Sequence, residues 1–204
     1  ARDVTVFQAQ KRLEQTGARR CFSARFSASL PGDPPLQFTT LPGVFAHRRA
    51  DEGGLALAEV AARDLAPGAR VLDMGCGCGL VGLLLARHAA VADVLCADSH
   101  TRAIHCTAQN AQANGLVGVR TVRTDEQLPA ESFTMFVGNP PYYSDYKIAE
   151  IFIQAAHRVL APGDLVGLDV GVRLKGCVGD SAATVCAGGR PAPLAARLLA
   201  ATQA

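Results

Sequence analysis

The sequence predicts an α/β domain with a mostly parallel sheet that is covered by helices on both faces and preceded by an N-terminal β-hairpin. Short apolar runs alternate with stretches of helical periodicity, the connections between them are short, and two polar signatures directly follow predicted strands. Alternating strands and helices form parallel sheets, because each helix returns the chain to the end at which the preceding strand began. Ligands of such sheets bind beyond the carboxyl ends of the strands.

The hairpin is predicted from two extended runs at residues 21–28 and 36–40. The first run alternates loosely between apolar and polar side chains, and a proline- and glycine-rich break separates it from the second. We therefore expect an N-terminal extension that contains the hairpin at residues 1–45, and the α/β domain at residues 46–204.

The α/β domain is predicted to open with an alanine- and leucine-rich helix at residues 54–65, which a Pro-Gly pair ends. The tail at residues 171–204 holds several glycines and two prolines, so no strand pair is predicted there, and an alanine–leucine run is a candidate last helix. The other predicted strands lie at 70–73, 93–98, 117–123, 133–138 and 165–170, and the other predicted helices at 80–88, 101–113 and 147–160.

Length and composition predict one soluble domain. The chain has 204 residues, of which 49% are hydrophobic and 19% charged. No apolar run reaches the length of about 18 residues that a membrane-spanning helix needs. Seven cysteines at irregular spacing favour reduced thiols in the cytoplasm over a secreted disulfide framework. A cysteine–histidine cluster matches no familiar zinc spacing, so no metal site is predicted; its members are Cys96, His100, His105 and Cys106.

The charge distribution leaves an RNA partner open. The formal net charge of +2 neither demands nor excludes a polyanion. Basic residues gather in two places, which predicts either a solvated basic face or contacts with RNA. Their members are Lys11, Arg12, Arg19, Arg20 and Arg25 near the N-terminus, and His47, Arg48 and Arg49 ahead of the domain.

A glycine-rich turn follows the strand predicted at 70–73. Gly75, Gly77 and Gly79 let the chain turn tightly and let a ligand approach the backbone. The spacing differs from the G-x-G-x-x-G pattern of dinucleotide sites, and Asp73 would repel a phosphate. The turn therefore predicts a nucleoside cofactor with a cationic end, such as S-adenosylmethionine, although a plain strand-to-helix connection also explains the glycines.

Carboxylates follow the next two predicted strands. Asp98 is placed to accept both ribose hydroxyls of a nucleoside, or to cap the helix that follows. Asp125 is placed to accept from an adenine amino group, or is a solvated loop acid, and Glu126 competes for the same role. Both alternatives stay open for each residue.

The run Asn139-Pro140-Pro141-Tyr142 follows the strand predicted at 133–138. The prolines stiffen the loop and lack N–H donors, so the Asn139 side-chain oxygen and the Pro140 carbonyl are left to accept both hydrogens of a planar amine. Tyr142 offers a flat face on which a base can stack. The run predicts a site that aligns an amine for methyl transfer without a general base. A rigid β-turn would explain the prolines but not their neighbours.

Over residues 36–170, these signatures resemble the Rossmann-like class I S-adenosylmethionine-dependent methyltransferases. The segment Leu41 to Phe45, with Asp51 and Gly53, is similar to the pocket-closing segment of the small methyltransferase domain family, including the small-subunit ribosomal RNA guanine-N2 methyltransferases. The resemblance implies a role for each site residue: Asp73, Gly75, Gly77 and Gly79 at the methionine end of the cofactor, Asp98 at the ribose, Asp125 at the adenine, Phe45 and Asp51 in the pocket wall, and Asn139, Pro140 and Tyr142 at the target amine.

The function that the resemblance implies is a cytoplasmic enzyme that methylates an exocyclic amine of a base in RNA, with guanine N2 of ribosomal RNA as the leading candidate. Tyr142 stands where the ribosomal guanine enzymes commonly carry phenylalanine. Tyrosine there is commoner in adenine-N6 and protein glutamine-N5 methyltransferases, which are the alternatives. A non-catalytic RNA-binding module that retains the fold is a third hypothesis, and the unusual tail supports it.

Overall fold

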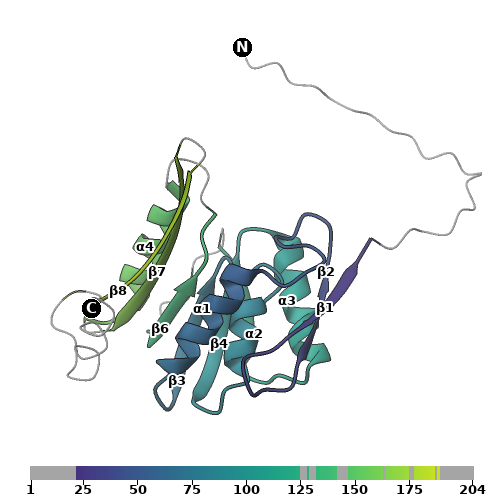
Figure 1. The fold of residues 1–204 in the computed structure, drawn as a ribbon. Coiled ribbons are helices and arrows are strands. Elements are labelled where there is room, and N and C mark those ends of the chain that lie inside the picture. The colour runs from purple at the N-terminus through teal and green to yellow at the C-terminus, as the bar shows by residue number, and fades with distance from the viewer. Residues whose placement is uncertain are drawn as a thin grey trace, which may run out of the picture.

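The computed structural model describes residues 22–124, 128, 132–141, 147–162, 164–174, 177–186 and 188. Its main feature is a six-stranded sheet in the order β5-β4-β3-β6-β7-β8, and a two-stranded hairpin, β1-β2, precedes it (Figure 1). The elements are β1 (Ala24–Ala28), β2 (Leu36–Thr40), α1 (Glu52–Arg63), β3 (Ala69–Met74), α2 (Leu80–Ala86), β4 (Val91–Asp98), α3 (Thr101–Ala113), β5 (Val119–Arg123), β6 (Met135–Gly138), α4 (Lys147–Val159), β7 (Leu165–Leu174) and β8 (Cys177–Cys186).

The sheet is mostly parallel, which confirms the predicted fold class. β3 pairs in parallel with β4 and β6, while β4 pairs with β5, and β6 with β7, in the same sense. Among the described strands of this sheet, β8 alone runs antiparallel to its neighbour. The carboxyl ends of β3, β4, β5 and β6 therefore meet at one edge, which is where ligands of such sheets bind.

Helices bury both faces of the sheet. Successive residues of a strand point to opposite faces, so Val71 and Leu72 of β3 belong to different apolar clusters, and both are fully buried. The face of Val71 packs against α1, α2 and α3, whereas the face of Leu72 packs against α4. In the described parts of the chain, no helix combines the length and the apolar character that crossing a bilayer requires.

The prediction of no strand pair after residue 170 is wrong. β7 extends to Leu174, and β8 pairs with it antiparallel from Leu174↔Cys177 to Leu165↔Cys186. Glycines argued against strands here, but the ladder is made by backbone N–H and C=O groups, which glycine also carries. The candidate last helix lies outside the described residues.

Asn110 of α3 and Asn114, the C-cap of this helix, fasten the hairpin to the domain. Asn114 accepts from the Gln37 N–H at 2.8 Å and donates to the Gln37 carbonyl at 2.7 Å. Asn110 makes the same pair of bonds with Thr39, at 2.8 and 3.1 Å. The spacings match because four residues of helix and two residues of strand both advance by about 6 to 7 Å. In this way α3 takes the place of a third strand along the edge of β2.

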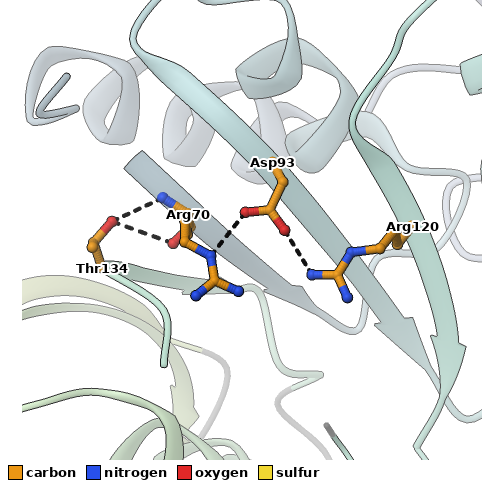
Figure 2. A network of polar contacts seen from close by, with 4 residues as sticks. All are labelled: Arg70, Asp93, Arg120 and Thr134. Atoms are coloured by element: carbon orange, nitrogen blue, oxygen red, sulfur yellow. Dashed lines mark hydrogen bonds and ion pairs between the residues drawn. The ribbon is translucent and has the colours of Figure 1, made fainter. Parts of the chain in front are cut away.

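A polar network joins the strands near their starts, at the edge opposite to their carboxyl ends (Figure 2). Asp93 of β4 accepts from Arg70 of β3 at 3.1 Å and from Arg120 of β5 at 2.6 Å. The backbone N–H of Arg70 donates to the side-chain hydroxyl of Thr134, just ahead of β6, at 2.9 Å. The network thus connects four neighbouring segments of the sheet and lies away from the edge at which a ligand site is expected.

Candidate active site

A cleft of about 1510 Å³ opens at the carboxyl edge of the sheet, beside the ends of β3, β4 and β6. This exceeds the about 300 to 1,000 Å³ of an ordinary small-molecule pocket, so the cleft has room for more than one ligand group. Its walls come from the loop after β2 (Gly43, Val44, Phe45), the start of α1 (Asp51, Gly53), the turn after β3 (Met74, Gly75, Gly77), the end of β4 and start of α3 (Asp98, Ser99, His100), the loop after β6 (Asn139, Pro140, Pro141) and one face of α4.

The structure brings most of the predicted site residues together in this cleft, although their assigned roles stay predictions. Asp73, in β3, and Gly79, the last glycine of the turn, do not line the cleft. Asp125 and Tyr142 lie outside the described residues. The predicted residues that do line it are Phe45, Asp51, Gly75, Gly77, Asp98, Asn139 and Pro140.

The glycine turn presents bare backbone to the cleft at Gly77. This residue has a φ of +59°, which side-chain-bearing residues rarely adopt, and a Cβ placed on it would meet no atom within 4 Å. Gly75, with a φ of +74°, is needed for another reason, because a Cβ there would lie 2.8 Å from the ring of Phe152. The turn is therefore open at one glycine and tightly packed at the other.

Asp73 is a buried link between β3 and α2. Its carboxyl group is 2% exposed and accepts from the Gly82 N–H at 2.9 Å. Desolvation by burial raises its pKa to about 7, while the hydrogen bond from Gly82 opposes this shift and the negative charge of Asp98 adds to it. Asp73 therefore holds the first turn of α2 against the end of β3, and its contact with the cofactor remains a prediction.

Asp98 connects the turn to the start of α3. One carboxylate oxygen accepts from the Gly77 N–H at 2.9 Å, and the other accepts from the His100 N–H at 2.8 Å. His100 itself is the N-cap of α3, since its ring accepts from the Arg102 N–H. A carboxylate has about four acceptor positions, so the half-buried Asp98 retains capacity for two further donors from the cleft.

Asn139 is held by Asp51 from a distant part of the chain. Its side-chain Nδ2 donates to Asp51 Oδ2 at 3.0 Å. The same oxygen accepts from the Gly54 N–H at 2.7 Å, which makes Asp51 the N-cap of α1. The sequence placed both residues in the pocket but contained no signal that they would form a pair.

Phe152 is a cleft residue that the sequence does not single out. Its ring would lie 2.7 Å from a Cβ on Gly138 and 2.8 Å from one on Gly75, so it packs tightly between the ends of β6 and β3. It belongs to the apolar face of α4 and is 9% exposed. Helical periodicity marks Phe152 as a core position, but it does not reveal which apolar residue of the helix reaches the cleft.

The cysteine–histidine cluster does not converge on one point. Cys96 and Cys106 are buried at 0% and 1% exposure, whereas His100 and His105 are exposed. In the part of the chain that the structure describes, no group of three or more His, Cys, Asp or Glu side chains is arranged to hold a metal ion. Burial also raises the pKa of the neighbouring Cys78 thiol to about 12, so this thiol is protonated at neutral pH.

A parallel sheet with a cleft at its carboxyl edge is the arrangement in which many α/β proteins bind nucleoside ligands. The sequence model of the methyltransferase small domain matches residues 35–167, and the chain belongs to this family. The members of this family are methyltransferases, and S-adenosylmethionine is the cofactor of the family.

Curated relatives include ribosomal RNA small subunit methyltransferase C of Pseudomonas aeruginosa (strain UCBPP-PA14), which is 33% identical over 162 residues. The protein of the same name from Hahella chejuensis is 35% identical over 135 residues. These matches cover 76% and 63% of this chain, but 48% and 38% of the respective relatives. The chain therefore spans half or less of the length of these relatives.

Similar solved structures bear on the fold alone. Methanocaldococcus jannaschii Trm5 in complex with adenosine gives a TM-score of 0.56 at 15% identity, covering 72% of this chain and 42% of that one. TrmN from Thermus thermophilus gives a TM-score of 0.50 at 22% identity, covering 62% and 46%. Both show that the fold of this chain is shared by known structures.

Proposed function

We propose that this chain transfers the methyl group of S-adenosylmethionine to an exocyclic amine of a base in RNA, and that the amine is guanine N2 of ribosomal RNA. One observation carries the proposal: the open Gly77 backbone and the Asp98 carboxylate share a single cleft with Asn139 and Pro140. A cofactor site and an acceptor site for an amine are therefore adjacent.

The residues of the cleft fit the cofactor. Gly77 leaves open space beside its backbone, which allows the methionine end to approach closely. Asp98 lies next to it, with acceptor positions for the two ribose hydroxyls. Gly79, at a φ of +86°, completes the turn, and Asp73 holds the helix behind it. The predicted adenine contact of Asp125 remains part of the proposal. When bound, S-adenosylmethionine supplies an electrophilic methyl group.

The contribution of this chain to the reaction is alignment of the amine. The Asn139 side-chain oxygen and the Pro140 carbonyl would accept its two hydrogens, which would hold the amine in a fixed plane and leave the nitrogen lone pair free. Phe45, which is 66% exposed, lies in the cleft wall, where a flat apolar side chain suits a base. Tyr142 is proposed to stack on the same base.

Ribosomal RNA is proposed as the substrate because the curated relatives carry that substrate in their names. Exposed Arg48 and Arg49 support it, since they lie in the loop between Phe45 and Asp51, both of which line the cleft. Cations in this position suit the phosphates that flank a target base. A reaction on ribosomal RNA would take place in the cytoplasm.

Transfer of tritium from S-adenosylmethionine labelled in its methyl group tests the proposal, with total bacterial RNA and a protein extract as parallel acceptors. We expect ribonuclease-sensitive label that appears as N2-methylguanosine after digestion to nucleosides. Label in N6-methyladenosine would shift the target to adenine, and label in protein would shift it to a glutamine amide. A protein that shows no heat of binding with S-adenosylhomocysteine would be a non-catalytic module.

Replacing the amine acceptor should separate turnover from cofactor binding. We expect Asn139→Ala to lower the initial rate of tritium transfer by about 100-fold or more, because the amine loses its alignment. The dissociation constant of S-adenosylhomocysteine, measured by calorimetry, should stay within about twofold of wild type. Gln109→Ala is a matched control, since this exposed amide on α3 lies outside the cleft. Equal loss of cofactor affinity and rate would contradict the assigned role.

A further inference from the structure

We infer that Asp51 is a positioning residue of this active site, which fixes the side-chain amide of Asn139 so that its oxygen faces the substrate amine. This inference rests on the proposed function. It adds a role that the pocket-wall assignment of Asp51 does not contain, and it depends on the hydrogen bond between the two side chains.

The polarity of this hydrogen bond settles which way the amide is turned. Asp51 Oδ2 accepts from the Gly54 N–H, and it also accepts at 3.0 Å from Asn139, whose donor is the Nδ2 group. The Asn139 oxygen then points away from Asp51. Among the described residues, no donor pairs with this oxygen, and it is not a buried atom without a partner. It is therefore available to a group in the cleft that Asn139 lines.

Without a partner, the amide of an asparagine can turn over with almost no change of shape, because its oxygen and nitrogen are nearly isosteric. A turned amide would present two N–H donors to a substrate amine that also needs acceptors. We call the Asn139 side-chain oxygen and the Pro140 carbonyl, which are proposed to accept the hydrogens of the amine, the amine clamp. The clamp requires the Asn139 oxygen to face the substrate, so it depends on the group that holds Asn139 Nδ2.

Asp51 is itself firmly held. Its Oδ2 accepts from the Gly54 N–H at 2.7 Å, and its backbone carbonyl accepts from the Leu55 N–H at 2.9 Å, so both groups anchor it to the first turn of α1. A Cβ on Gly54 would lie 3.3 Å from Leu80 of α2, which shows how closely the start of α1 packs on the domain. The carboxylate therefore approaches Asn139 from a rigid element.

The glycines that follow Asp51 lie beside this hydrogen bond. A Cβ on Gly53 would touch both of its ends at ordinary contact distance, 3.4 Å from Asp51 Oδ2 and 3.5 Å from Asn139 Nδ2. A Cβ on Gly54 would crowd Asp51 Oδ2 more closely, at 3.3 Å, so glycine suits position 54.

Two substitutions at position 51 separate positioning from helix capping. Aspartate, asparagine and serine all cap helices well, so Asp51→Asn and Asp51→Ser should both keep α1 in place. The amide oxygen of asparagine can accept both bonds that Oδ2 accepts now. The serine hydroxyl is attached one bond closer to the backbone, so it can reach the Gly54 N–H but not Asn139.

The experiment measures tritium transfer to total RNA at saturating S-adenosylmethionine for wild type, both variants and Asn139→Ala. We expect Asp51→Ser to be about 10- to 100-fold slower than wild type, and Asp51→Asn to stay within about threefold. Calorimetry with S-adenosylhomocysteine should give dissociation constants within about twofold of wild type for both variants. A capping role alone would give the two variants equal rates.

The outcomes distinguish this inference from the function on which it rests. If Asn139→Ala is inactive while Asp51→Ser keeps the wild-type rate, or while Asp51→Asn is as slow as Asp51→Ser, the positioning role is overturned and the proposed function stands. If Asn139→Ala keeps the wild-type rate, the proposed amine clamp itself is overturned. Asp64→Asn, at the other end of α1, is the matched control for loss of a carboxylate and should keep the wild-type rate.

Discussion

Asp73 shows how a single buried carboxyl group can serve a ligand site that it does not line. A polar group at the end of a parallel strand is expected to face the ligand, and this is the role that the sequence predicts for Asp73. In the structure its Oδ2 accepts from the Gly82 N–H, and a Cβ on Gly82 would lie only 2.9 Å from that oxygen. This hydrogen bond fixes the helix behind the glycine turn, while the contact of Asp73 with the cofactor stays a prediction.

The raised pKa of Asp73 predicts a characteristic pH dependence of stability. The folded-state pKa of about 7 lies above the value of about 3.9 for an unfolded chain, so the native state binds an extra proton between these values. The free energy of unfolding should therefore fall as pH rises through this window, by up to about 1.4 kcal/mol per pH unit, and this decrease should end above the folded pKa. Asp73→Asn should remove this contribution.

Urea denaturation of wild type and Asp73→Asn at pH values between about 4.5 and 8 measures the pH-dependent contribution of Asp73 to the free energy of unfolding. As pH rises, wild type should lose more unfolding free energy than Asp73→Asn does. Parallel curves for the two proteins over this range would show that the burial of Asp73 is not linked to its ionisation.

The docking of the hairpin depends on a match between two kinds of secondary structure. Asparagine is an average helix former, and in the sequence Asn110 and Asn114 look like an ordinary surface position and an ordinary helix end. They become informative only beside β2, whose N–H and C=O groups at Gln37 and Thr39 recur with the same spacing. Asn110 is 2% exposed and also donates to the Cys78 carbonyl at 2.9 Å, so it connects the hairpin to the glycine turn.

Asn110→Ala should destabilise the protein by about 3 kcal/mol, because it leaves the half-buried N–H and C=O of Thr39 and the buried C=O of Cys78 without this partner. Urea denaturation measures the loss, and hydrogen exchange should show the Thr39 amide exchanging faster than in wild type. Gln109→Ala, one residue away and exposed, should change stability by less than about 0.5 kcal/mol. A comparable loss in both variants would contradict the role given to Asn110.

In the molecule as a whole, the cleft exists only because segments far apart in the sequence end at one edge of the sheet. The loop after β2, the starts of α1 and α3, and the loops after β3 and β6 each contribute one wall. Binding to such an assembled site should stabilise the entire fold, since the unfolded chain has no equivalent site.

S-adenosylhomocysteine at 100 times its dissociation constant should therefore add about 2.7 kcal/mol to the free energy of unfolding, or about 5 to 10 °C to Tm in a chain of this size. The shift should persist in Asn139→Ala. In Asp98→Ala it should shrink to about 1 °C if the dissociation constant rises about 100-fold, because the ribose loses its acceptor. Thermal unfolding followed by circular dichroism measures both. An undiminished shift in Asp98→Ala would exclude Asp98 from the cofactor site.

The order of strands and helices was predictable because it depends on local patterns. Apolar runs and helical periodicity located β3 to β6 and α1 to α4 within a few residues, and both signatures were found at strand ends, next to the cleft. The β7–β8 pair was missed, because its glycines conceal a ladder that is formed between backbones. Phe152 was missed as a cleft residue because periodicity identifies a buried face and not the neighbour of each residue.

The residue types of the site and their places at strand ends follow from the chain alone, because turns, caps and strand ends are specified by neighbours in sequence. The partner of each polar atom does not, because it depends on where the parallel sheet brings distant strand ends. Folding placed Asp51 against Asn139, directed Asp73 to Gly82 and paired Asn110 with Thr39. These contacts hold the groups of the cleft in position, and each joins residues that are remote in sequence or separated by the glycine turn.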